Sequence, residues 1–230
     1  MSLLGRGGVW QTGQPVPGAG RYCCSLVVVR VLVKLLVLMV SLAGCVSRPP
    51  PPDWQLASSA AARRFEAAWL QGQDRLAAAE LTRARSELAL TARPDLRARL
   101  ELLACALRVA SLMFDECPGY LLLAPDASAE QQDYAAYLGG RASARDATQA
   151  LVDEDPLTQL VAAGVLFRQG RLDPAGLGSA VDTASAQGWR RPLLAWLGAQ
   201  RALALRRGDT QAAARIQRRI DLVLEQPPAQ

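Results

Sequence analysis

Apolar residues recur every three or four positions through most of the chain beyond residue 52, a spacing typical of helices. No segment alternates between apolar and polar residues over the length of a strand. Capping residues, prolines at first helical positions and terminal glycines divide this pattern. We therefore expect helices over 58–72, 74–92, 94–114, 128–139, 143–151, 155–170, 173–188, 192–208 and 209–225.

The segments are short and closely connected, which predicts an all-α fold of antiparallel helical hairpins. Two predicted helices differ in how many apolar faces they have. Helix 94–114 has leucines on one face and a second apolar face that includes Leu102 and Val109, which predicts a central helix packed on two sides. The last helix has one apolar face, with Ala213, Ile216 and Ile220 inward.

The composition agrees with helices and removes common catalytic groups. Alanine and leucine supply 41 and 37 of the 230 residues, and there are only two isoleucines. Histidine, the usual general base and metal ligand, is absent, and Lys34 is the single lysine. We therefore expect no catalytic function, no cofactor and no metal site.

The N-terminal region has the parts of a secretory signal. An apolar stretch over 35–43 follows Arg30 and Lys34 and precedes small residues and Cys45. Residues 1–44 are therefore predicted to be a signal region, within which the glycine-rich segment 1–28 indicates an over-extended start. The alternative is an uncleaved transmembrane helix over 26–46, which would bury both cations.

The motif Leu42-Ala43-Gly44-Cys45 resembles the lipobox of bacterial lipoproteins. This resemblance implies cleavage between Gly44 and Cys45 and acylation of the Cys45 thiol. Because Val46 rather than aspartate follows, it implies an outer-membrane anchor facing the periplasm, with an inner-membrane anchor as the alternative. Four prolines over 49–52 predict a stiff stem, so that 45–56 form the lipidated stem and 57–230 the all-α domain.

Three glycines are each followed, five positions later, by an alanine. The pairs are Gly72 and Ala77, Gly170 and Ala175, and Gly208 and Ala213. This pattern of helix, glycine turn and helix resembles tetratricopeptide repeats, which implies an α-solenoid. An irregular helical bundle is the alternative that the residues leave open.

Cys105 and Cys117 are the two cysteines that remain after Cys45 is acylated, and they are a candidate disulfide in an oxidising compartment. Twelve residues of one straight helix would separate them by about 18 Å. A bridge tolerates only about 4.4–6.8 Å between Cα atoms. The bridge therefore requires the helix to end near Met113 and the segment 115–119 to fold back. Buried free thiols are the alternative.

Other candidate groups are more typical of structure than of chemistry. The acids 153–155 directly precede a proline, which favours a capping turn over a pair of catalytic carboxylates. Tyr134 and Tyr137 are candidates for lining a groove, although packing is the preferred interpretation. The same interpretation is preferred for the tryptophans at 54, 69, 189 and 196.

The charges are unevenly distributed. Beyond residue 44 the chain has 22 arginines against 21 acids, which disfavours nucleic-acid binding despite the isoelectric point near 9.3. From Arg190 onward there are eight arginines and three acids. Arg215, Arg218 and Arg219 are therefore a candidate basic surface for an acidic partner or anionic lipid, with a merely solvated face as the alternative.

These patterns favour a non-catalytic interaction module, or scaffold, that is held at the outer membrane by lipid and binds a periplasmic or envelope protein. One alternative is a structural tether to the cell wall. Another is a periplasmic ligand-binding protein or enzyme that uses carboxylates.

Overall fold

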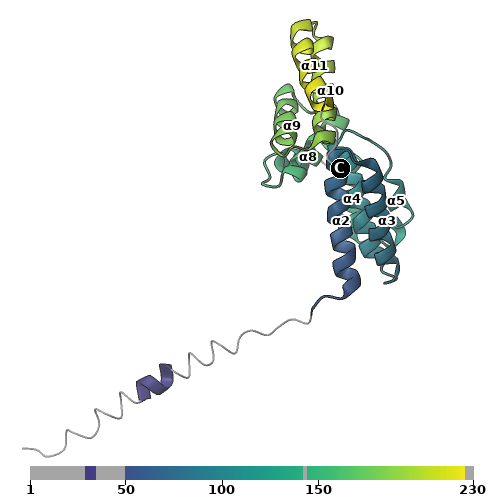
Figure 1. The fold of residues 1–230 in the computed structure, drawn as a ribbon, viewed down its shortest axis with the longest axis vertical. Coiled ribbons are helices and arrows are strands. Elements are labelled where there is room, and N and C mark those ends of the chain that lie inside the picture. Colours follow the sequence, from purple (N-terminus) through teal and green to yellow (C-terminus); the bar gives the residue numbers. More distant parts are fainter. Residues whose placement is uncertain (1–28, 35–49, 142–143, 226–230) are drawn as a thin grey trace, which may run out of the picture. The chain divides into compact units, whose positions relative to one another are not determined.

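The computed structural model describes residues 29–34, 50–141 and 144–225, which contain helices and no strands (Figure 1). The all-α prediction is confirmed. The chain divides into two units, residues 1–50 and 51–230. In the first unit, residues 29–34 are helical and exposed, whereas the predicted lipobox from Leu42 to Cys45 lies outside the described residues. No helix in the described part of the chain has the length and hydropathy needed to cross a bilayer.

The second unit contains ten α-helices and one 3-10 helix among its described residues. They are α2 (Asp53–Gln71), α3 (Asp74–Ala89), α4 (Pro94–Ala110), α5 (Pro118–Leu121), η1 (Ala124–Asp126), α6 (Ala129–Leu138), α7 (Ala144–Ala150), α8 (Pro156–Arg168), α9 (Pro174–Ala186), α10 (Arg190–Arg206) and α11 (Thr210–Glu225).

Helix α2 begins earlier than the sequence predicted. It starts at Asp53, directly after Pro52, so residues 53–56 belong to the helix and not to the stem. The indole of Trp54 packs against a cluster of buried residues from α2, α3 and α4. Partial burial of this first-turn side chain favours a helix that extends toward the prolines, beyond the predicted start at 58.

Helix α4 is the central helix, as predicted. Ten of its 17 residues are buried. Two tryptophans from distant parts of the chain donate hydrogen bonds to its backbone: Trp69 Nε1 to the Leu107 carbonyl at 3.2 Å and Trp196 Nε1 to the Ala110 carbonyl at 3.0 Å. The indoles thus attach α2 and α10 to α4, and these two tryptophans are packing residues.

Helix α4 is shorter than predicted and ends at Ala110 rather than near Phe114. Leu112 adopts a left-handed backbone conformation with φ of 57°, and the Met113 N–H donates to the Arg108 carbonyl at 2.8 Å. This closing turn satisfies a terminal carbonyl of the helix. The chain then reverses direction over the segment before α5.

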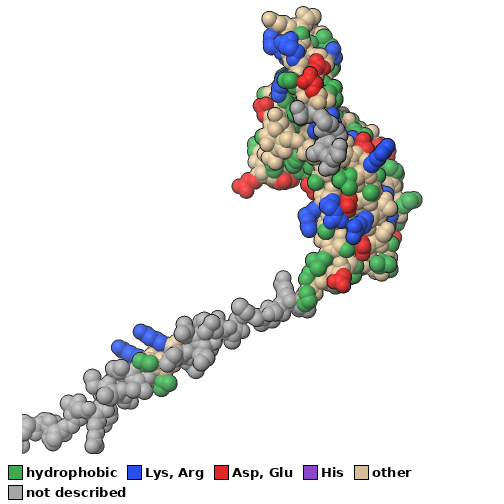
Figure 2. All heavy atoms as spheres, viewed as in Figure 1, with side chains coloured by type: hydrophobic (Ala, Val, Ile, Leu, Met, Phe, Trp, Pro, Cys, Tyr) green, Lys and Arg blue, Asp and Glu red, His purple; other side chains and the backbone are tan. Residues whose placement is uncertain are grey.

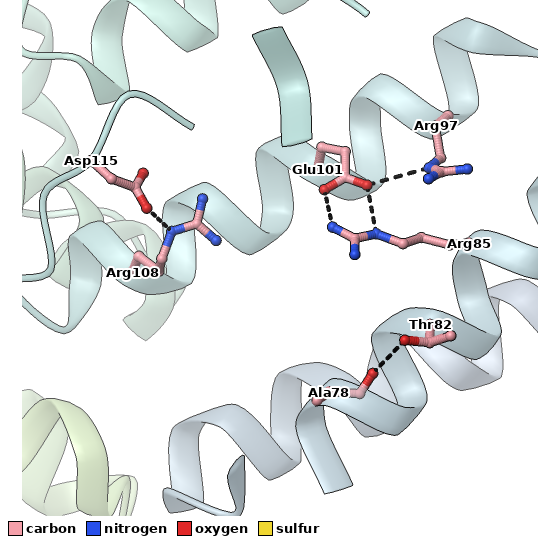
Figure 3. Close-up of polar contacts among 7 residues, drawn as sticks. All are labelled: Ala78, Thr82, Arg85, Arg97, Glu101, Arg108 and Asp115. Carbon is pink, nitrogen blue, oxygen red and sulfur yellow. Dashed lines mark hydrogen bonds and ion pairs between the residues drawn. The ribbon is translucent and has the colours of Figure 1, made fainter. Parts of the chain in front are cut away.

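A buried carboxylate joins α3 to α4 (Figure 3). Glu101 is 3% exposed and accepts two hydrogen bonds from Arg85 of α3, at 2.8 and 2.6 Å, and one from Arg97 at 3.3 Å. Gly119 of α5 lies against the same carboxylate, so closely that a Cβ atom at this position would overlap it. The glycine therefore allows α5 to pack beside the ion cluster.

Glycine turns join three helical hairpins, but the small residues after them do not behave alike. Gly72, Gly170 and Gly208 all have left-handed backbones, with φ of 77°, 68° and 74°. Ala77 and Ala213 are buried at 2% and 3% exposure, as close helix packing requires. Ala175 is exposed, so in the α8–α9 hairpin the alanine of the repeat pattern does not mediate close packing of the two helices.

We expect Gly164→Ala to destabilise the domain by about 1–3 kcal/mol, because overpacking forces packed backbones apart. A Cβ atom on Gly164 of α8 would overlap the Val109 carbonyl of α4. Gly178→Ala in α9 is the matched control, since its Cβ atom would enter open space. The control should stabilise by about 0.5–1 kcal/mol through higher helix propensity. Urea unfolding of both variants measures this, and equal effects would refute the close α4–α8 contact.

Candidate functional site: a basic groove beside the C-terminal hairpin

Helices α9, α10 and α11 border a groove with a volume of about 510 Å³. We call it the C-terminal groove. Its apolar lining comes from all three helices: Pro174 and Leu177 of α9, Leu203 and Ala204 of α10, and Ala212 and Ile216 of α11. Its polar lining comprises Gln200, Arg207, Asp209, Arg215 and Arg219.

Local sequence determines how α11 meets α10. The left-handed backbone of Gly208 reverses the chain, and the Asp209 carboxylate accepts a hydrogen bond from the Ala212 N–H at 2.8 Å, which caps the new helix. The small side chain of Ala213 is buried where the two helices approach. This register places Ile216 half-buried at the groove, between Arg215 and Arg219.

The groove has an excess of positive charge. Arg207, Arg215 and Arg219 are exposed and form no ion pair with any residue that the structure describes. Asp209 is the single acid in the lining, and its carboxylate already caps α11. Figure 2 shows blue basic side chains on the part of the domain formed by α10 and α11, with a few red acidic ones among them. The groove therefore favours an anionic ligand with an apolar face.

The structure separates the three arginines that the sequence grouped. Arg215 and Arg219 are four residues apart and line the groove, whereas Arg218 is exposed and is not part of the lining. Arg207 completes the basic rim and is not among the arginines that the sequence indicated. The sequence did contain a signal for Arg207. This residue directly follows α10 and lies four positions after Leu203, and residues four apart share a helix face, so both are expected on the same side.

One polar atom beside the C-terminal groove lacks a partner. The Oε1 atom of Gln200 is buried and accepts no hydrogen bond within the described part of the chain. An unpaired buried oxygen is unfavourable by about 1–3 kcal/mol.

The candidate cysteines lie together. Cys105 and Cys117 are joined as a disulfide, with Cα atoms 5.5 Å apart, and both residues are buried. The early end of α4 brings them together, because Cys117 belongs to the returning segment. Its N–H donates to the Asp115 carboxylate at 2.9 Å, and the same carboxylate pairs with Arg108 at 2.7 Å (Figure 3).

These residues also have donor atoms close enough for a metal ion. The sulfurs of Cys105 and Cys117 and a carboxylate oxygen of Asp115 lie within 4.8 Å of one another. In the disulfide neither sulfur is available as a thiolate ligand, and the Asp115 carboxylate already forms an ion pair with Arg108. The oxidised group is therefore a cross-link without free soft ligands.

The acids before α8 form a capping turn. The Asp155 carboxylate accepts hydrogen bonds from the N–H and the hydroxyl of Thr158, at 2.9 and 2.8 Å. Asp153 accepts from the Asp155 N–H at 2.8 Å. This arrangement is the one that the sequence favoured.

Protein-family models, curated proteins and solved structures were compared with this chain, and none matches it significantly. The inference about function therefore depends on the residues and the geometry described above.

We expect the cross-link to stabilise the domain by about 3 kcal/mol, because it closes a loop of 12 residues in the unfolded chain. Cys117→Ser should lower the free energy of unfolding by this amount, measured with urea under non-reducing conditions. Adding reductant should lower the stability of the original chain to that of the variant and leave the variant unchanged. The full-length chain has five cysteines, so the bridge leaves three free thiols, and five free thiols on the purified, unreduced chain would contradict the pairing.

Proposed function

We propose that this protein is a non-catalytic, lipid-anchored scaffold of the bacterial cell envelope. In this proposal Cys45 carries the lipid, residues 46–52 lift the helical domain from the membrane, and the C-terminal groove binds an acidic, amphipathic helix of a protein partner. The single observation that supports the binding function best is the arrangement of three unpaired arginines around an apolar groove.

The chemistry of the N-terminal region supports the anchor. The lipobox-like motif ends on Cys45, and the apolar stretch before it follows two cations. Several acyl chains on one cysteine hold a protein at a bilayer stably, whereas one chain binds only marginally. The side chains also favour a non-catalytic function, because the chain has no histidine and its one lysine precedes the proposed cleavage site.

The apolar lining and the charges of the C-terminal groove support an amphipathic helical ligand. A helix that binds in a groove inserts apolar residues spaced three and four apart. Leu177, Leu203 and Ile216 offer apolar contacts from three different helices. Glutamates that flank the inserted residues would pair with the arginines of the rim. Opposite charges of this kind raise association rates and select the partner more than they add affinity.

A synthetic amphipathic helix with a leucine face flanked by glutamates tests the binding function. We expect the Arg215→Glu, Arg219→Glu double variant to bind it at least about tenfold more weakly than the original chain. Fluorescence anisotropy of the labelled peptide measures the affinity. Binding should also weaken as salt is raised, because the arginines are exposed to solvent.

Arg218→Glu provides the control, because it reverses one charge on the same helix outside the groove. Its matched partner is the single variant Arg215→Glu, which also reverses one charge but lines the groove. Arg218→Glu should leave the affinity within about twofold. A peptide with lysines in place of the glutamates should not bind. The binding proposal is wrong if Arg218→Glu weakens binding as much as Arg215→Glu, or if both peptides bind equally.

Replacement of the acylated residue tests the anchor separately. We expect Cys45→Ala to release the protein from the detergent-requiring membrane fraction and to abolish incorporation of labelled fatty acid. A cell fractionation followed by immunoblotting measures the first effect. Cys117→Ala is the control, because it replaces a cysteine of the folded domain that lies outside the lipobox-like motif, and it should leave fractionation unchanged. Retention of the Cys45→Ala chain would refute the anchor and leave the groove experiment unaffected.

A further inference from the structure

A second groove lies between α4, α6 and the start of α8 and shares no lining residue with the C-terminal groove. Its volume is about 450 Å³, within the usual range for small-ligand sites. We call it the tyrosine groove, because Tyr134 and Tyr137 of α6 both line it. Packing is the interpretation that the sequence favours for these two residues, whereas the structure places them at an accessible cavity.

The walls of the tyrosine groove combine apolar side chains with aromatic rings. Leucines, a valine and an alanine line it from two sides: Leu102, Leu103 and Ala106 of α4, and Leu157 and Val161 of α8. The two tyrosine rings stack with centroids 6.0 Å apart and planes inclined by 18°. Aromatic faces attract cations electrostatically, most strongly where water is partly excluded.

The polar groups of the tyrosine groove select against an anion. Two carboxylates, Glu130 and Asp155, line it, and Arg99 is the one cation among the lining residues. None of the ion pairs among described residues joins Arg99 to either acid. The N-termini of α6 and α8 also face this region, but Ser128 and Asp155 already cap them.

The capped helix ends have a consequence for the ligand. An uncapped helix N-terminus offers free N–H groups to an anion. Here the Gln131 N–H donates to the Ser128 hydroxyl at 3.3 Å, and the Thr158 N–H donates to Asp155. An anion in the tyrosine groove would therefore meet two carboxylates against one cation, Arg99, and these two N–H groups would not compensate for the difference.

The pKa values of two groups near the tyrosine groove are raised, in part by the negative charge of Asp155. Burial and, to a smaller extent, the charge of Asp155 raise the pKa of Tyr134 to about 12. Burial and then the same carboxylate raise the pKa of Glu66 on α2 above its usual value. The charge of Asp155 is thus the smaller cause of both shifts, and no ion pair among the described residues includes this carboxylate. A cationic ligand would offset this negative charge.

We propose that the tyrosine groove binds a ligand with a primary ammonium group on an apolar body, namely the free amino terminus of a short apolar peptide. The ammonium lies between the carboxylates of Glu130 and Asp155 and against the tyrosine rings. The apolar side chains of the peptide contact Leu103, Leu157 and Val161. This inference concerns a different surface from the C-terminal groove and does not depend on the lipid anchor.

Titration calorimetry of the purified full-length chain with the tripeptide amide Leu-Ala-Leu tests the proposal. Its N-acetyl form has the same side chains and no ammonium, so we expect it to bind at least about tenfold more weakly. We expect a similar loss for Asp155→Asn. Asparagine caps helices about as well as aspartate, so this variant should fold normally, and a thermal melt followed by circular dichroism checks that it does.

Two further variants separate the roles of charge and ring. Glu154→Gln is the matched control. Glu154 is next to Asp155 in the sequence but does not line the groove, so its neutralisation should leave binding unchanged. Tyr134→Leu keeps all charges and should weaken binding through loss of an aromatic face. Equal affinity for the free and acetylated peptides overturns the proposal. So does failure of the free peptide to bind at about 10 mM, where the affinity would be too weak for a specific site.

Discussion

Helix α4 is enclosed by the other helices of the domain, and its polar groups therefore need partners inside the protein. The carboxylate of Glu101 takes two of its hydrogen bonds from Arg85 of α3, and the carbonyls of Leu107 and Ala110 take theirs from tryptophans of α2 and α10. A buried charge or carbonyl without a partner is strongly unfavourable. Each of these bonds sets the register of one surrounding helix against α4, so the positions of α2, α3 and α10 follow from the same requirement.

Both grooves result from how the outer helices attach to this centre. Helix α10 is held from two directions, since Trp196 bonds to α4 while Arg191 stacks on the Trp69 ring at 4.3 Å and donates to its carbonyl. Helix α11 packs chiefly on α10, so part of its apolar face remains open toward α9. On another side, α6 and α8 approach α4 with their capped ends, and the space that remains between them is lined by tyrosines. The two grooves differ in charge: arginines surround one, and carboxylates predominate in the other.

The turn after α4 connects this packing with the proposed location of the protein. Residues 111–117 reverse the chain through two non-glycine residues with left-handed backbones, Leu112 and Cys117, an arrangement that is locally unfavourable. The Arg108–Asp115 ion pair and the disulfide hold this segment in place. Disulfides persist in oxidising compartments such as the periplasm. A cross-link at this turn is therefore compatible with an exported protein, as the lipobox-like motif also predicts.

Much of the fold followed from sequence because local rules govern helix ends. The aspartates before Pro156 and Pro174, the capping box at Ser128 and the glycine turns determined where α6, α8 and α9 begin or end, and apolar residues on two faces identified α4 as central. Local rules placed α2 and α4 less well, because partial burial of Trp54 favours a longer α2 and a left-handed Leu112 follows the end of α4. The grooves were beyond sequence alone. Arg207 lines one groove with Arg215 and Arg219, and Tyr134 lines the other with Asp155, only because different helices pack together. Helix periodicity shows which face of a helix is buried, but it does not specify which other helix covers that face.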